Sequence, residues 1–154
     1  MRPFAVPGLQ RGTAYYLMGQ EEEARWHLEK FLEGTREQQT IDDLTESFRL
    51  SFQSIAYAML GDFDSALAAA EQAMLLFPAE RDALFGQGMF DNQTWVMAMA
   101  GQRDEALERI ATSIGQPNGL IPMALHKDPN WDFFRDDERF NKLIKPANLK
   151  EASQ

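Results

Sequence analysis

The chain has no cysteine and only two histidines among its 154 residues. The lack of cysteine excludes disulfide bonds and thiolate metal sites. A single histidine with no second ligand nearby is not a metal site, because a bound metal needs several ligands at once. We therefore expect neither a metal nor a cofactor.

Positive charge is also scarce, with 15 basic residues against 24 acidic ones and a net charge of −9. Nucleic acids and anionic membrane surfaces both attract basic patches, so this balance argues against either partner. No apolar run approaches the roughly 18 to 20 residues of a membrane-spanning helix. The N-terminal residues Met1–Pro7 lack the long apolar core of a signal peptide. The sequence thus predicts a cytoplasmic protein.

What the chain does contain is helical periodicity. Hydrophobic residues make up 44% of the sequence, enough for one domain over residues 1–154 with its own core. Residues 57–78 show two apolar helical patterns joined by a Gly-Asp turn and ended by a proline. Three alanines of this stretch, at positions 66, 70 and 73, fall on one helix face and allow a second helix to approach closely.

The same spacing recurs along the chain. The turn glycines Gly19, Gly61 and Gly101 lie 42 and 40 residues apart, and each is followed five residues later by an alanine. The middle copy resembles a tetratricopeptide (TPR) repeat, a helix–turn–helix unit with an aromatic, a turn glycine, an alanine and a terminal proline at set positions. The residues that carry this resemblance are Tyr57, Gly61, Ala66 and Pro78, with the degenerate copies Gly12, Tyr15, Gly19, Ala24 and Met97, Gly101, Ala106.

The resemblance implies an all-α, TPR-like right-handed superhelix, an α-solenoid of three helical hairpins with a C-terminal cap of short helices. The hairpins are expected at about residues 9–33, 41–77 and 80–115, and the cap at about 120–145. Gly86 and Gly88 predict a kink in the third hairpin or a helix start nearer Met89, because glycine disfavours helix interiors.

Several local features are predicted from side-chain chemistry. Thr40 and Asp43 have capping-box spacing, and Asp62 follows the turn glycine as an N-cap. Asp136 is the expected cap of the last short helix. Trp26 is expected to pack inside the fold.

Residues 120–145 resemble the segment that closes repeat arrays in bacterial multidomain regulators. The matching residues are Asp128, Pro129, Trp131, Asp132, Arg135, Asp137, Arg139 and Phe140, with Phe134 where leucine is usual. Such arrays are typically joined to cyclase, kinase or DNA-binding domains, and none of these is found in this chain. Asp128 is expected to cap a short helix with Pro129 at its first position. Residues 146–154 are expected to form a frayed end.

By the same resemblance, the first helix of each hairpin lines a concave face. The expected partner-binding residues are Tyr16, Leu17, Ile55, Met59, Asp91, Trp95 and Met99. The alternative is that some of them pack between hairpins or under the tail. Family members that hold a C-terminal carboxylate use basic and amide side chains here. At those places this chain has Leu9, Thr13, Ser51 and Ile55, so that activity is not expected.

We therefore predict a non-enzymatic protein-binding scaffold that serves as the regulatory tail of a larger signalling protein. Its concave groove would bind an apolar or amphipathic peptide or helix with basic flanks, with Trp95 as anchor. Two alternatives stay open. One is a small-molecule sensor or weak hydrolase that uses the acidic tail and His126. The other is a purely structural domain that forms a homo-oligomer.

Overall fold

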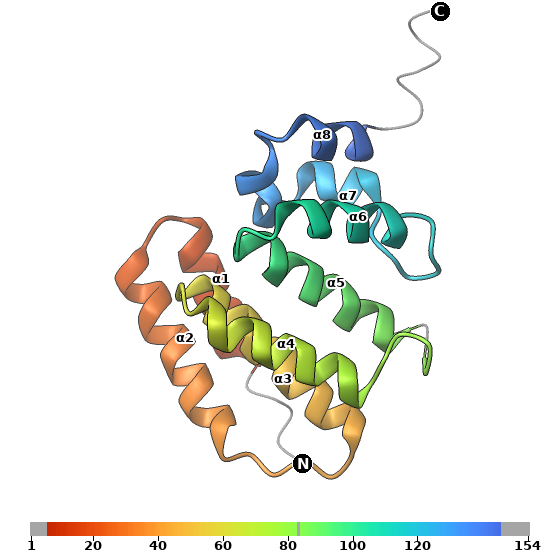
Figure 1. The fold of residues 1–154 in the computed structure, drawn as a ribbon. Coiled ribbons are helices and arrows are strands. Elements are labelled where there is room, and N and C mark those ends of the chain that lie inside the picture. The colour runs from red at the N-terminus through yellow and green to blue at the C-terminus, as the bar shows by residue number, and fades with distance from the viewer. Residues whose placement is uncertain (1–5, 83, 146–154) are drawn as a thin grey trace, which may run out of the picture.

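The computed structural model describes residues 6–82 and 84–145, and these are 75% helical with no strand. The chain is therefore all-α over that range, as predicted. Residues 146–154, expected to be a frayed end, lie outside it. The helices in chain order are α1 (Val6–Leu17), α2 (Glu21–Arg36), α3 (Asp43–Met59), α4 (Phe63–Leu76), α5 (Phe85–Met99), α6 (Arg103–Ser113), α7 (Pro122–Lys127), the 3-10 helix η1 (Pro129–Phe134) and α8 (Glu138–Ile144) (Figure 1).

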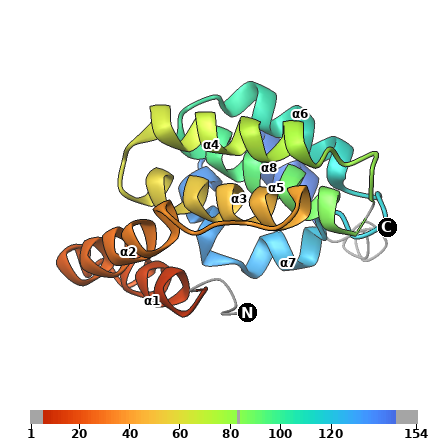
Figure 2. The same cartoon turned by 90° about the horizontal axis from the view of Figure 1, so that it is seen from below.

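Successive helices pack against one another along the chain. The pairs α1–α2, α3–α4 and α5–α6 form three hairpins, and α3 contacts both α1 and α5 (Figure 1). Viewed from below, α3 and α5 lie between α4 and α6 on one side and α7 on the other (Figure 2). The first helix begins at Val6, earlier than the expected start near Leu9. Pro7 does not prevent this, because proline is tolerated in the first turn of a helix.

Each hairpin turns at a glycine with a positive φ. These values are +69° at Gly19, +80° at Gly61 and +85° at Gly101. Glycine adopts this left-handed conformation without steric cost. In each turn the residue after the glycine donates its amide to the carbonyl five residues earlier, at 2.9 to 3.0 Å, which satisfies the helix end. The following helix then starts at once, antiparallel to the first.

The alanine five residues after each glycine is buried. Ala24, Ala66 and Ala106 have at most 4% of their surface exposed. A methyl side chain at this position lets the second helix of the hairpin lie close to the first. The glycine and alanine pattern thus fixes both the turn and the interhelical contact.

The two glycines near the start of α5 play different roles. The predicted start near Met89 is four residues late, because α5 runs from Phe85 to Met99 and contains both glycines, while the predicted kink stays a prediction. A Cβ on Gly86 would lie 2.5 Å from the Cα of Ala79, so the preceding loop passes directly over this position. Nothing lies within 4 Å of the corresponding point on Gly88. Asp82 accepts hydrogen bonds from the first amides of the helix and fixes its start.

We predict opposite effects for two alanine substitutions in this turn. Gly86→Ala forces backbone atoms apart and lowers the free energy of unfolding by about 1–3 kcal/mol. Gly88→Ala, at an exposed helical position, raises it by up to about 1 kcal/mol. Urea denaturation of both variants checks this, and equal effects at the two glycines would contradict the assigned roles.

Two helix caps were predicted in the second hairpin. Asp62 caps α4 as predicted, accepting the amide of Ser65 at 3.2 Å. The capping box at residues 40–43 is wrong: Asp42 is the N-cap of α3 and accepts the amide of Thr45 at 2.7 Å. The hydroxyl of Thr40 instead donates to the Glu46 carboxylate. Asp42 lies two residues nearer the helix start than Thr40 and therefore has the better reach to the free amides.

In the tail, one predicted cap is correct and the other lies one residue away from the observed cap. Asp128 caps η1 with Pro129 in its first turn, as predicted. The prediction of Asp136 as cap of α8 is wrong, because Asp137 accepts the amide of Arg139. The Arg139 side chain also donates to this carboxylate, which lowers the pKa of Asp137 to about 2. Asp136 pairs instead with Arg103 of α6.

Trp26 was expected inside the fold, but 58% of its surface is exposed. The buried positions Ala24, Leu28 and Phe31 define the inner face of α2. Position 26 is two residues from both Ala24 and Leu28, which places it on the opposite side of a helix with 3.6 residues per turn. Its ring lies nearly perpendicular to the ring of His27, with the two centroids 4.7 Å apart.

The cap covers the third hairpin through an aromatic cluster. Trp131, Phe134 and Phe140 are buried, and their ring centroids lie 5.0 to 6.3 Å apart. The guanidinium of Arg103 lies over the Phe134 ring and donates to the carbonyl of Phe133. Helix α8 contacts α6 directly. The tail is therefore part of the main hydrophobic core.

Truncation of this cluster should cost much of the stability of the domain. We expect Phe140→Ala to lower the free energy of unfolding by about 3–5 kcal/mol, because it empties a fully buried site. Leu75→Ala, at a side chain that is 70% exposed, should change it by less than about 0.5 kcal/mol. Thermal or urea melts of the two variants compare them. Similar stabilities would show that the cap is not part of the cooperative unit.

Candidate functional site

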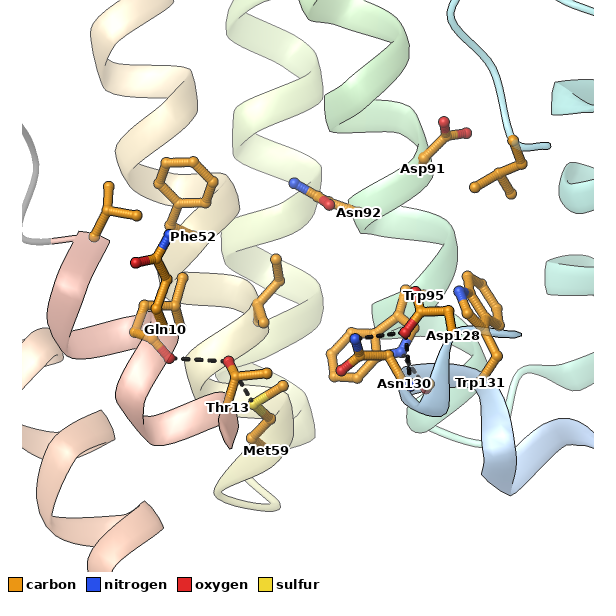
Figure 3. A pocket seen from close by; sticks show the side chains of 14 residues that line it. Gln10, Thr13, Phe52, Met59, Asp91, Asn92, Trp95, Asp128, Asn130 and Trp131 are labelled. Atoms are coloured by element: carbon orange, nitrogen blue, oxygen red, sulfur yellow. Dashed lines mark hydrogen bonds between the residues drawn. The ribbon is translucent and has the colours of Figure 1, made fainter. Parts of the chain in front are cut away.

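A cavity of about 630 Å³ opens between α1, α3 and α5 on three sides and the C-terminal cap on the fourth (Figure 3). The first helix of each hairpin contributes one wall, and the start of η1 closes the far end. The lining residues are Val6, Leu9, Gln10, Thr13, Phe52, Ile55, Met59, Asp91, Asn92, Trp95, Leu120, Asp128, Asn130 and Trp131.

A second cavity of about 400 Å³ lies beside the first, where the end of α1 faces η1. Asn130 lines both cavities, so they are neighbours along one surface. We call the two together the groove. The second cavity is lined by Tyr16, Leu17, Gly19, Glu21, Met99, Pro129, Asn130, Asp132 and Phe133.

All seven residues predicted for the concave face line this groove. The larger cavity contains Ile55, Met59, Asp91 and Trp95. The smaller one contains Tyr16, Leu17 and Met99. The structure thus brings the predicted residues together on one surface, while their role in binding a partner stays a prediction.

The seven side chains are not equally accessible. Trp95 is only 6% exposed, and its indole N–H donates to the carbonyl of Asn130 at 2.9 Å (Figure 3). It therefore belongs to the core as well as to the groove wall, and little of it is left for a partner. Tyr16 is 37% exposed and offers a better contact surface.

Asp91 is the charged group held most firmly in the wall. Its Oδ1 accepts a hydrogen bond from the Ser113 hydroxyl at 2.6 Å and another from the Gln87 amide at 3.0 Å. Burial nevertheless raises the pKa of Asp91, because desolvation disfavours the carboxylate and outweighs these two hydrogen bonds. The same Ser113 hydroxyl accepts the amide of Leu120 at 3.0 Å, so Asp91 is joined to the loop that leads to the cap.

We predict that Asp91→Asn stabilises the protein at neutral pH. Because the folded carboxyl holds its proton to a higher pH than the unfolded one, the parent loses stability as pH rises through the interval between the two pKa values. Asparagine keeps an acceptor for Ser113 and has no charge to desolvate. The variant should therefore melt at a higher temperature at pH 7, and its advantage should vanish below the ordinary aspartate pKa of about 3.9.

Thermal melts across this pH range, with Asp64→Asn as control, measure the effect. Asp64 is exposed on α4, so its replacement removes one negative charge without touching the groove. An Asp91→Asn variant that is less stable than the control at every pH would show that the carboxylate contributes to folding.

The groove carries charge of only one sign. Its acidic members are Asp91 and Asp128 in the larger cavity and Glu21 and Asp132 in the smaller one. None of the described residues that line it is lysine, arginine or histidine. The potential in the groove therefore favours a positively charged occupant.

Sequence reasoning missed the contribution of the tail to the groove. The cavities are lined in part by three tail residues, Asn130, Trp131 and Phe133. These residues were predicted only as part of the C-terminal cap and not as part of a binding surface. The sequence does predict a short helix that starts at Asp128-Pro129, but this pattern does not show which surface of the domain the helix contacts. His126, considered for an enzyme site, is exposed on α7 and lies outside both cavities.

Comparisons of the chain with protein-family models, curated proteins and solved structures gave no significant match. Within residues 6–82 and 84–145, no helix combines the length and apolar character needed to cross a bilayer. The same part of the chain holds no group of three or more His, Cys, Asp or Glu side chains placed to bind a metal ion. Function is therefore inferred from the geometry and charge of the groove.

Proposed function

We propose that the chain is a non-enzymatic protein-interaction module that binds a peptide or helix in the groove. We also propose that its three hairpins form a TPR-like right-handed superhelix. The shared glycine turns, the buried alanines that follow them and the contacts of α3 with both α1 and α5 support this architecture.

The observation that carries the functional proposal is the composition of the groove walls. The first helices of all three hairpins and the cap meet there, around two adjacent cavities of about 630 and 400 Å³. Half-buried apolar side chains such as Phe52 and Ile55 remain open to a ligand at the base of the larger cavity. An elongated, partly apolar groove suits a segment of polypeptide, as in other cases where a helix or strand docks between helices.

The charge of the groove adds a preference for basic partners. Four carboxylates line it without any basic side chain, and the whole chain has a net charge of −9. A peptide with lysine or arginine flanks would be attracted from a distance. Binding should therefore weaken as salt is added, because the interactions of exposed charges are screened.

Selection from a random peptide library displayed on phage tests this function. The enriched peptides should be amphipathic and basic. Tyr16→Ala should weaken their binding about tenfold, or about 1.4 kcal/mol, because it removes an accessible aromatic contact from the groove. Phe63→Ala is the matched control, since Phe63 is also 37% exposed but lies on α4 outside the groove.

Fluorescence polarisation with the selected peptides gives both affinities, and thermal melts show that both variants are folded. Equal affinities of the Tyr16 and Phe63 variants would place the binding surface elsewhere. Failure to enrich any peptide over an unrelated helical protein would contradict a peptide-binding role altogether.

One observation favours a second candidate, a small-molecule sensor. The larger cavity has a volume within the range of about 300–1,000 Å³ that is typical of ligand pockets. A thermal-shift screen of small cationic and neutral compounds distinguishes the two functions. A compound that raises the melting temperature while no peptide binds would favour the sensor.

A further inference from the structure

Two pairs of half-buried polar side chains line the larger cavity. Asp91 and Asn92 lie on α5, and Asp128 and Asn130 lie at the start of η1 (Figure 3). The hydrogen bonds that these side chains form within the protein determine which atoms remain for a ligand.

Part of the donor capacity of this lining is already used, although each asparagine amide keeps a second N–H. The amide of Asn92 donates to the Ser51 hydroxyl at 3.0 Å, and the amide of Asn130 donates to Oδ1 of Asp128 at 2.8 Å. The indole N–H of Trp95 is taken by the carbonyl of Asn130. The hydroxyl of Thr13 donates to the carbonyl of Leu9.

Acceptors, by contrast, remain available. Among the described residues, Oδ2 of Asp91, Oδ2 of Asp128 and the side-chain oxygens of Asn92 and Asn130 have no hydrogen-bond partner. No buried side-chain oxygen or nitrogen in the described part of the chain lacks a partner, so these four oxygens are open to solvent. The cavity thus presents oxygen acceptors, two of them on carboxylates, beside the remaining amide N–H donors of Gln10, Asn92 and Asn130.

A wall of this kind selects its ligand by hydrogen bonding as well as by charge. A guanidinium group brings five N–H donors, no acceptor and a permanent positive charge. A carboxylate or phosphate would be repelled, and a neutral amide would leave the charges of the two carboxylates uncompensated. The apolar surface of Leu9 and Phe52 beside these oxygens suits the aliphatic stem of a long side chain.

We propose that the larger cavity receives an arginine side chain of the bound peptide, with its guanidinium beside Asp91 and the cap residues Asp128 and Asn130. This proposal rests on the peptide-binding function above and names the residue that the groove selects. The raised pKa of Asp91 is consistent with it, because a neighbouring cation would stabilise the carboxylate that burial disfavours.

Small amphipathic probes test the proposal without knowledge of the natural partner. We would titrate n-octylguanidinium into the protein and follow backbone amides by nitrogen–proton NMR. Two matched probes are n-octylurea, which has N–H donors but no charge, and n-octyltrimethylammonium, which has the charge but no donors. The guanidinium should bind at least fivefold more tightly than either and shift the amides of Asp91, Asn92 and Asn130.

The variant Asp91→Asn should reduce guanidinium binding about tenfold, whereas Asp64→Asn should leave it unchanged. A thermal melt of Asp91→Asn in the same buffer shows whether the variant is folded, so that a loss of binding is not mistaken for unfolding. Equal binding of the two cationic probes, or an unchanged affinity in Asp91→Asn, would overturn the arginine proposal.

The peptides selected above separate this proposal from the general function. Replacement of their arginines by citrulline, which is neutral and nearly the same shape, should weaken binding about tenfold in the parent and by less than twofold in Asp91→Asn. If citrulline peptides bind the parent as well as the originals do while Tyr16→Ala still weakens binding, the peptide-binding function holds and the arginine site does not.

Discussion

The glycine turns are the constraint on which the rest of the structure depends. At Gly19, Gly61 and Gly101 the backbone adopts a left-handed conformation, and the next helix starts within two residues. Reversal over so short a distance forces the two helices of each hairpin to lie antiparallel and in contact. A side chain at any of these glycines would meet conformational strain even though the space around it is open.

Much of the fold follows from such local rules, and the sequence predicts it well. The hairpins, the Asp62 cap and the Asp128-Pro129 start of a short helix depend on spacings of a few residues, which are visible in the chain. The errors have a different origin. Trp26 was assigned by its chemical type rather than by its angular position on α2, and Gly86 by its helix propensity rather than by the loop that crosses it.

The candidate site could be predicted only in part for the same reason. Its α1, α3 and α5 residues come from a repeated pattern, so a family resemblance was enough to choose them. Asn130 and Trp131 enter the groove because the tail folds back over the third hairpin, which no spacing in the sequence reveals. The hydrogen bonds that decide which polar atoms of the groove stay free also depend on three-dimensional contacts, such as that between Asn92 and Ser51.

The Ser113 hydroxyl has a consequence that reaches beyond the wall of the cavity. It donates to Asp91 and accepts the amide of Leu120, and Gly119 approaches the Ser113 backbone so closely that no side chain would fit there. The groove acid and the anchorage of the cap therefore share one atom. A ligand that altered the hydrogen bond between Asp91 and Ser113 would therefore also act on the hydroxyl that holds the Leu120 amide at the start of the cap.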